Sequence, residues 1–107
     1  MPTWSGMERV EPGMTVGVLS LLLSIPGCAS LKEKRSRLKP LLARLRREFN
    51  ISVAEIDRQD AWQETVIACA LVNSSAAQVQ RSLQSVVEWI EEYWPDMDLV
   101  DQKIELR

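Results

Sequence analysis

The spacing of apolar residues switches repeatedly along this chain between the two-residue period of a strand and the period of about 3.6 residues of a helix. Strand-like alternation covers 15–25, 51–57 and 99–106, and 65–72 is apolar on both sides, which is typical of a central strand covered on both faces. Helix-like spacing covers 30–49 and the stretch from the capping residues at 73–75 to Trp94, after which Pro95 ends the pattern. The order of elements is therefore strand, helix, strand, strand, helix, strand.

This order is that of the split βαβ or ferredoxin-like fold, an α+β fold with a four-stranded antiparallel sheet and two helices on one face. Right-handed crossovers place the first and third strands at the centre of such a sheet. The same two stretches, 15–25 and 65–72, are the most apolar of the predicted strands. In the last strand we expect Val100, Ile104 and Leu106 to share the inner side, opposite the charged residues between them.

A chain of 107 residues is long enough for one core, which we place at 14–107 as a single domain. Residues 1–13 contain two prolines and two glycines without any period, so we expect a flexible N-terminal extension. The apolar run at 16–25 is too short to cross a membrane and no basic segment precedes it. These observations predict a cytoplasmic protein without membrane association.

The composition disfavours an enzyme. The chain has no histidine, so neither Cys28 nor any serine has the usual general base beside it. Cys28 and Cys69 lack metal-like or redox spacing, and we expect both to stay reduced, with Cys69 acting as a small buried hydrophobe. Four glycines form no phosphate-binding loop, and the Asp-rich stretch at 96–101 lacks the glycine of a calcium loop. We therefore predict a non-enzymatic protein with no metal and no cofactor.

The first predicted helix concentrates the positive charge of a chain whose formal net charge is only -2. Ser30 and Glu33 form a capping box at its start. Pro40 either kinks this helix on its outer face or splits it, with a restart at Pro40. Eight of the thirteen Lys and Arg residues lie on its outer face and flanks: Lys32, Lys34, Arg35, Arg37, Lys39, Arg44, Arg46 and Arg47.

These eight residues are candidates for contact with an anion or with RNA, because cations near free helix N–H groups attract phosphate. The alternative is a solvated face whose Lys and Arg stems cover apolar surface, which is the commoner role of such charge runs. The last twenty residues are acidic, so the molecule is also dipolar and suited to pairing with itself.

The face of the sheet away from the helices is the second candidate surface. Val16, Val18 and Leu22, joined by one side of 67–72, predict an apolar patch suited to a homodimer, unless edge side chains and the N-terminal segment cover it. Trp62, in the polar connection before the third strand, either folds over a sheet edge or contacts a base or a partner. We assign Trp89, on a flank of the second helix, to protein contact.

Three stretches together resemble the YlxP-like family of small bacterial proteins of unknown function: Ser30-Leu31-Lys32-Glu33-Lys34-Arg35, Asn50-Ile51-Ser52-Val53-Ala54-Glu55-Ile56 and Asp60-Ala61-Trp62-Gln63. The likeness runs from about Met14 to the end of the chain. It implies a ferredoxin-like fold, cytoplasmic residence and genes often found among those for translation initiation and ribosome maturation. It implies no enzymatic activity and assigns no functional residues.

Two functions remain open from the sequence. The first is accessory interaction with RNA or a ribosome-related complex through the basic first helix. The second is protein–protein assembly, in which the chain forms a homo-oligomer through the open face of its sheet. The steepness with which binding is lost as salt rises distinguishes contact with phosphates from other contacts.

Overall fold

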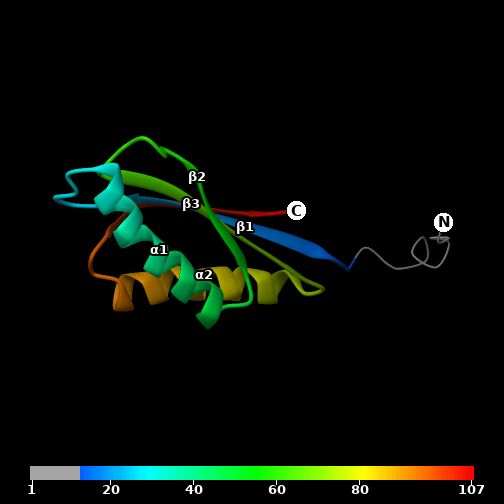
Figure 1. Ribbon diagram of the computed structural model, residues 1–107. Coiled ribbons are helices and arrows are strands. Elements are labelled where there is room, and N and C mark those ends of the chain that lie inside the picture. Colours follow the sequence, from blue (N-terminus) through cyan, green and yellow to red (C-terminus); the bar gives the residue numbers. More distant parts are fainter. Residues whose placement is uncertain (1–12) are drawn as a thin grey trace, which may run out of the picture.

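The structure is a computed structural model that describes residues 13–107. The predicted N-terminal extension therefore lies outside the described residues except for Gly13. The described part has the predicted order of elements (Figure 1): β1 Thr15–Ser24, α1 Leu31–Glu48, β2 Ser52–Asp57, β3 Glu64–Asn73, α2 Ala76–Tyr93 and β4 Asp98–Leu106. None of the helices in this part is long and apolar enough to cross a membrane.

The four strands form one sheet in the order β2-β3-β1-β4, and every neighbouring pair is antiparallel. The prediction that the first and third strands occupy the centre is confirmed. Both helices lie on the same side of the sheet, below it in Figure 1. The fold is thus the predicted ferredoxin-like α+β arrangement, with one sheet face covered by helices and the other open within the described residues.

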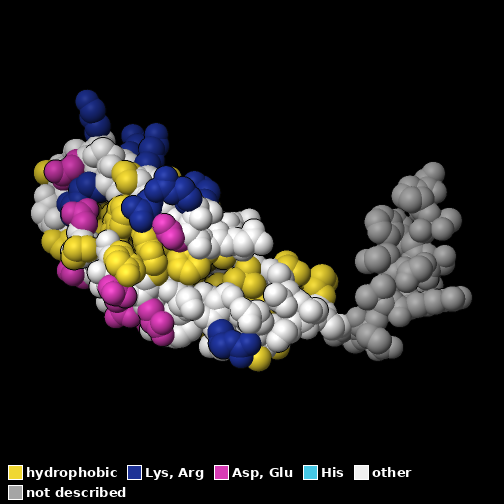
Figure 2. Space-filling view, turned by 90° about the horizontal axis from the view of Figure 1, so that it is seen from below, with side chains coloured by type: hydrophobic (Ala, Val, Ile, Leu, Met, Phe, Trp, Pro, Cys, Tyr) yellow, Lys and Arg dark blue, Asp and Glu magenta, His cyan; other side chains and the backbone are white. Residues whose placement is uncertain are grey.

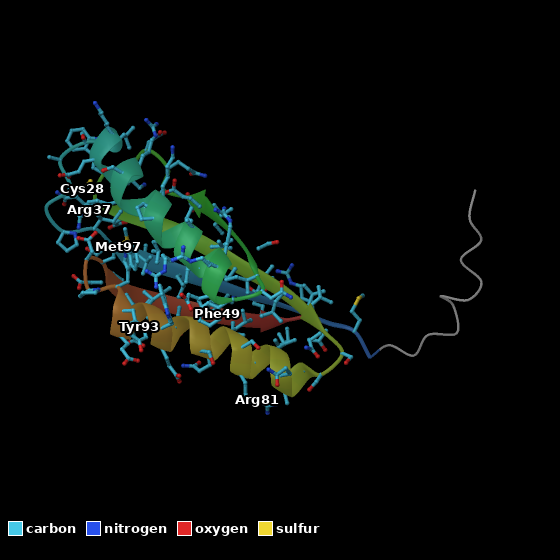
Figure 3. The ribbon with its side chains drawn as sticks, turned by 60° about the horizontal axis from the view of Figure 1, so that its bottom comes forward. Cys28, Arg37, Phe49, Arg81, Tyr93 and Met97 are labelled. Carbon is cyan, nitrogen blue, oxygen red and sulfur yellow. The ribbon has the colours of Figure 1, made fainter. Side chains whose placement is uncertain are left out.

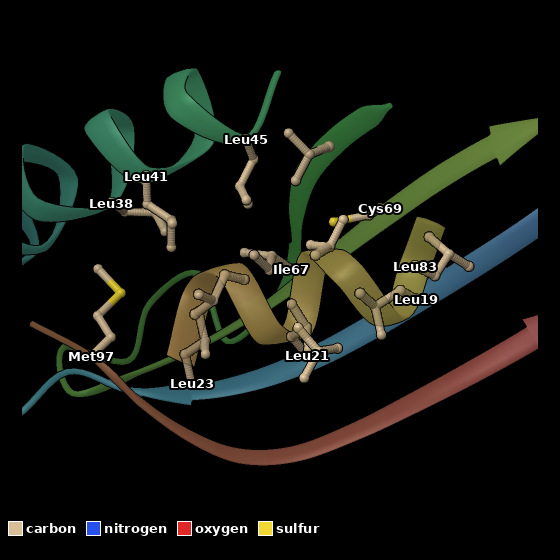
Figure 4. Packing of buried hydrophobic residues seen from close by; sticks show 14 of the residues in the cluster. Leu19, Leu21, Leu23, Leu38, Leu41, Leu45, Ile67, Cys69, Leu83 and Met97 are labelled. Carbon is tan, nitrogen blue, oxygen red and sulfur yellow. The ribbon is translucent and has the colours of Figure 1, made fainter. Parts of the chain in front are cut away.

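Successive side chains of the central strands point alternately toward the helices and away from them. Leu19 pairs with Cys69 and Leu21 with Ile67, and all four side chains are buried toward the helices. They meet the apolar sides of α1 and α2 in the core shown in Figure 4, with Leu38, Leu41 and Leu45 from α1 and Leu83 from α2. The intervening residues of β1 and β3 face away from the helices.

Gly17 lies where β1 passes closest to α2. A Cβ atom built on Gly17 would collide with Cγ1 of Val79 and would come within 2.8 Å of Cδ1 of Leu83. The absence of a side chain at this core-facing position therefore allows α2 to pack directly on the backbone of β1.

β4 departs from the alternation expected from the sequence. The register of β1 with β4 shifts between Leu22, which pairs with Asp101, and Leu23, which pairs with Leu99. Val100 is the extra residue of this β-bulge and is 60% exposed, so the prediction that it shares the inner side with Ile104 and Leu106 is wrong. A bulge reverses the inside–outside alternation beyond it, and no local residue pattern signals it here.

Capping side chains define the starts of both helices. The Ser30 hydroxyl accepts a bond from Glu33 N (3.0 Å), as predicted, whereas Glu33 Oε2 accepts from Ala29 N (2.7 Å), one residue before the cap, rather than from the Ser30 N–H of the predicted capping box. Pro40 is exposed and α1 runs through it as one helix, so the alternative of a split helix is wrong. Pro40 has no N–H to donate to the Ser36 carbonyl, and on the exposed side of the helix solvent can reach that carbonyl.

Candidate functional site

The eight candidate cations of α1 separate into groups with different environments. Lys34 is buried, with 2% of its side chain exposed. Its Nζ lies 2.9 Å from Glu55 Oε2 on β2 and donates to the carbonyl of Arg58 (2.7 Å) in the loop that follows. Thr65 of β3 donates to the same Glu55 oxygen (2.6 Å). Lys34 therefore joins α1 to the sheet, and the expectation that it faces an external anion is wrong.

The burial of Lys34 is indicated by its position in the helical pattern. Lys34, Leu38, Leu41 and Leu45 follow one another at spacings of four, three and four residues, which is the spacing of a single buried helix side. The partner residue Glu55 had no such signal, because a charged residue on a short edge strand is ordinarily solvated. Neither Glu55 nor Thr65 was identified from the sequence.

Two further cations face α2 and the segment after it. Arg37 bonds through Nε to Asp96 Oδ2 (3.0 Å) and through Nη1 to the Pro26 carbonyl (2.9 Å), and Figure 3 shows it near the turn at Cys28. The hydrogen bond to Asp96 raises the pKa of Arg37. Arg44 lies over the Trp89 ring, 5.5 Å from its centroid, and bonds Glu48. These two arginines act within the fold.

The remaining cations of α1 lie on its outer side, where an external anion can reach them. Lys32, Arg35, Lys39 and Arg46 are exposed, and their separations of three, four and seven residues bring them to one side of the helix at about 100° per residue. We call these four residues the α1 strip. None of them has an acidic partner within 4.0 Å among residues 13–107.

The α1 strip lies beside the edge strand β2. Arg46 Nη2 donates to the Val53 carbonyl of β2 (2.9 Å), which places the strip on the side of α1 away from α2. Arg47 is also exposed but lies about 100° further round the helix than Arg46. In Figure 2 the Lys and Arg side chains gather over α1, whereas acidic side chains dominate one end of α2. The basic surface is thus an elongated strip along the outside of one helix.

The N-terminus of α1 is occupied by the protein's own carboxylate. Glu33 accepts a bond from Ala29 N, and this hydrogen bond lowers the pKa of Glu33. A negative side chain there satisfies the helix dipole and repels a second anion. The predicted anion site combined free helix N–H groups with cations. Because Glu33 already lies at the helix N-terminus, only the cations further along α1 remain for such a site.

The open sheet face has the expected apolar centre. Val16 pairs with Val72, Val18 with Ala70 and Leu22 with Val66, and all these side chains point away from the helices. Val72 is 60% exposed and the others are partly exposed. A shallow hollow of about 120 Å³ lies over Ser20 and Leu22, bordered by Asp101 and Lys103 of β4. Within the described residues, neither helix covers this face.

The two tryptophans predicted to contact partners have different environments. Trp89 packs edge-on against Phe49 (6.3 Å between centroids) and is stacked on Trp94 (6.0 Å), so it belongs to an aromatic cluster between α1 and α2. Trp89 is half-buried there, and its contact with a partner stays a prediction. Trp62, in the β2–β3 loop, is 51% exposed. About half of this side chain therefore stays in water, and both alternatives, folding over a sheet edge and contact with a base or a partner, stay predictions.

Both cysteines are free and buried, and burial raises the pKa of the Cys69 thiol to about 12. Cys69 is therefore protonated at neutral pH and behaves as an apolar core residue. Within the described part of the chain, no group of three or more Cys, Asp or Glu side chains is arranged to hold a metal ion.

Comparisons with known proteins give a family and one fold likeness. The family described as "Protein of unknown function (DUF503)" matches residues 16–104. The chain is 45% identical over 64 residues to "Uncharacterized protein YlxP" of Bacillus subtilis (strain 168), a match that covers 60% of this chain and 70% of that protein. The solved structure "De novo designed protein Foldit4" has a TM-score of 0.50 at 13% identity, covering 88% of this chain and 96% of that one. The last likeness concerns the fold alone.

Proposed function

The chain belongs to the DUF503 family, whose function is unknown, and we propose that it is an accessory RNA-binding protein that holds the phosphate backbone against the α1 strip. The observation that carries the proposal is the row of exposed cations at Lys32, Arg35, Lys39 and Arg46, which have no acidic partner within 4.0 Å among residues 13–107. Unpaired cations in a row neutralise phosphates and release counterions, the main source of sequence-independent affinity.

The geometry of the strip suits a linear polyanion. From Lys32 to Arg46 the helix rises fourteen steps, or about 21 Å, which is long enough to meet several successive phosphates. The four strands contain no aromatic residue, so bases cannot stack on the sheet as they do in RNA-recognition motifs. Contact with the backbone therefore supplies the main, sequence-independent part of the affinity.

Fluorescence anisotropy of a labelled single-stranded RNA over a salt series tests this function. Arg35→Glu should weaken binding strongly, whereas Arg81→Glu should not, because Arg81 is an exposed helical arginine on α2, away from α1 (Figure 3). The double variant Lys32→Ala/Lys39→Ala should reduce the slope of log K against log salt by about 1.4 for single strands. Equal effects of Arg35→Glu and Arg81→Glu, or no binding of the wild type at low salt, would contradict the proposal.

A second function, assembly of the chain with a second copy of itself, is favoured by the open sheet face. Apolar residues at the centre of this face are partly exposed, and soluble monomers rarely leave a large contiguous apolar patch in water. Along its margin, β4 presents Asp101, Lys103 and Glu105 in alternation. A surface with both charges in alternation can face itself across a two-fold axis and match unlike charges.

Sedimentation velocity over a wide concentration range tests assembly. Ala70→Lys places a charge at the centre of the open face and should yield monomer, whereas Ala77→Lys, the same substitution on the exposed first turn of α2, should not. Lysine at position 70 is tolerated in a monomer because its stem can lie along the sheet while its ammonium reaches water. A wild type that stays monomeric at about 100 µM, where even micromolar affinity would be visible, contradicts assembly.

A further inference from the structure

The β2–β3 loop, residues 58–63, is held rigidly although it lies at the surface. Lys34 of α1 donates to the Arg58 carbonyl (2.7 Å) at the start of the loop. At its end, the Gln63 side chain donates to the Cys28 carbonyl (3.2 Å), and the Gln63 carbonyl accepts a bond from Ile25 N (2.9 Å). These three hydrogen bonds join the loop to α1 and to residues 25–28, which precede α1. A side chain presented by this loop keeps a defined position.

Trp62 is that side chain. It is 51% exposed and makes no ring–ring or cation–π contact with any residue in 13–107, unlike Trp89 and Trp94, which pack together. An open hollow of about 520 Å³ lies beside it. Leaving so large an apolar ring half in water forgoes burial that usually stabilises a fold. The free ring face is available to another flat group.

The loop lies at the N-terminal end of the α1 strip. Lys34, which bonds the loop, is the residue before Arg35 and two residues after Lys32. Figure 1 shows the β2–β3 connection next to the start of α1. The hollow at Trp62 is also lined by Asp60 and Glu64; Glu64 is bonded to Arg58, whereas Asp60, which has no cation within 4.0 Å among residues 13–107, disfavours phosphate there and can accept hydrogen bonds from N–H groups. Phosphate is therefore favoured on the strip, and a neutral base with N–H donors in the hollow.

Resting on the proposed RNA-binding function, we propose that Trp62 is a stacking platform for one unpaired nucleobase of a single strand whose phosphates lie along the α1 strip. Base–aromatic stacking tolerates every base because each has a π face, and it is unavailable to bases paired inside a duplex. The ligand class is thus single-stranded RNA rather than double-stranded RNA. The rigid loop adds affinity because little ordering is needed on binding.

Binding of three fluorescent probes to the wild type, Trp62→Ala and Trp62→Phe tests this role. The probes are a single-stranded RNA, a duplex of the same length and an abasic oligonucleotide with the same number of phosphates. Trp62→Ala should weaken binding of the single strand about tenfold, while Trp62→Phe should retain most of it. Binding of the abasic probe and the salt slope should stay unchanged. Tyr93→Ala, which removes an exposed aromatic residue from α2, is the matched control.

The outcomes separate the two proposals. Equal loss of the abasic and single-stranded probes on Trp62→Ala would mean that the substitution disturbs the strip or the fold, and would overturn the stacking role. Full single-strand binding by Trp62→Ala, with binding still lost in Arg35→Glu, overturns stacking and leaves RNA binding standing; Trp62 would then be open to a protein partner. No binding of any probe by the wild type overturns both.

Discussion

Replacing Lys34 with methionine gives the sharpest test of the structure. Methionine has nearly the same length, so the space beside Leu38 stays filled while the ammonium is removed. Glu55 then loses its counterion, 2.9 Å away, and the Arg58 carbonyl loses a donor at 2.7 Å. The change isolates the polar contribution of a side chain that is 2% exposed.

The expected cost follows from the burial of both partners. Removing one member of a fully buried ion pair costs about 3–5 kcal/mol. Glu55 is 20% exposed and keeps its bond from Thr65, so water and the hydroxyl compensate in part. We therefore expect Lys34→Met to lower the free energy of unfolding by about 3 kcal/mol, near the lower end of that range.

Urea denaturation at neutral pH measures this change, and a double-mutant cycle assigns it. Glu55→Gln removes the charge but keeps an oxygen to accept the Thr65 bond. In Lys34→Met/Glu55→Gln, no unpaired carboxylate remains, so the loss should be smaller than the sum of the two single losses by at least about 1 kcal/mol. Lys32→Met, on the exposed side of the same helix turn, should change stability by no more than about 0.5 kcal/mol.

A Lys34→Met variant as stable as Lys32→Met would refute the reasoning, because it would mean that Lys34 reaches water in solution. Strict additivity in the cycle would show instead that the loss comes from packing or from the carbonyl contacts, with no coupling to Glu55. The first result would also remove the Lys34 contact that holds the start of the β2–β3 loop.

Three further predictions concern the core, a thiol and the helix cap. Gly17→Ala should cost about 1–3 kcal/mol in urea denaturation, because its Cβ would collide with Val79. Cys69 should react with iodoacetamide only after unfolding, as shown by mass spectrometry with and without urea, because it is buried and its pKa is raised to about 12. The lowered pKa of Glu33 stabilises the fold above the ordinary value of 4.5, and this contribution is lost as the pH falls. The stability advantage of the wild type over Glu33→Gln should therefore shrink from about pH 6 to about pH 3 in thermal melts.

The order of elements and the central place of β1 and β3 could be predicted because they depend on periodicity and on crossover handedness, which are properties of the chain itself. The bond from Glu33 N to the Ser30 cap was also readable, since its partners are three residues apart. The bulge at Val100 was not, because its position depends on how β4 aligns with β1 across the sheet.

The local pattern determined that α1 is amphipathic and strongly basic, because side-chain direction in a helix follows from spacing alone. Only the tertiary structure decided which cations remain outside. Lys34 meets Glu55, twenty-one residues later, and Arg37 meets Asp96, fifty-nine residues later. Contacts between such distant residues depend on the packing of whole elements, so the sequence determined the helix and the packing decided which of its cations stay on the outside without an acidic partner.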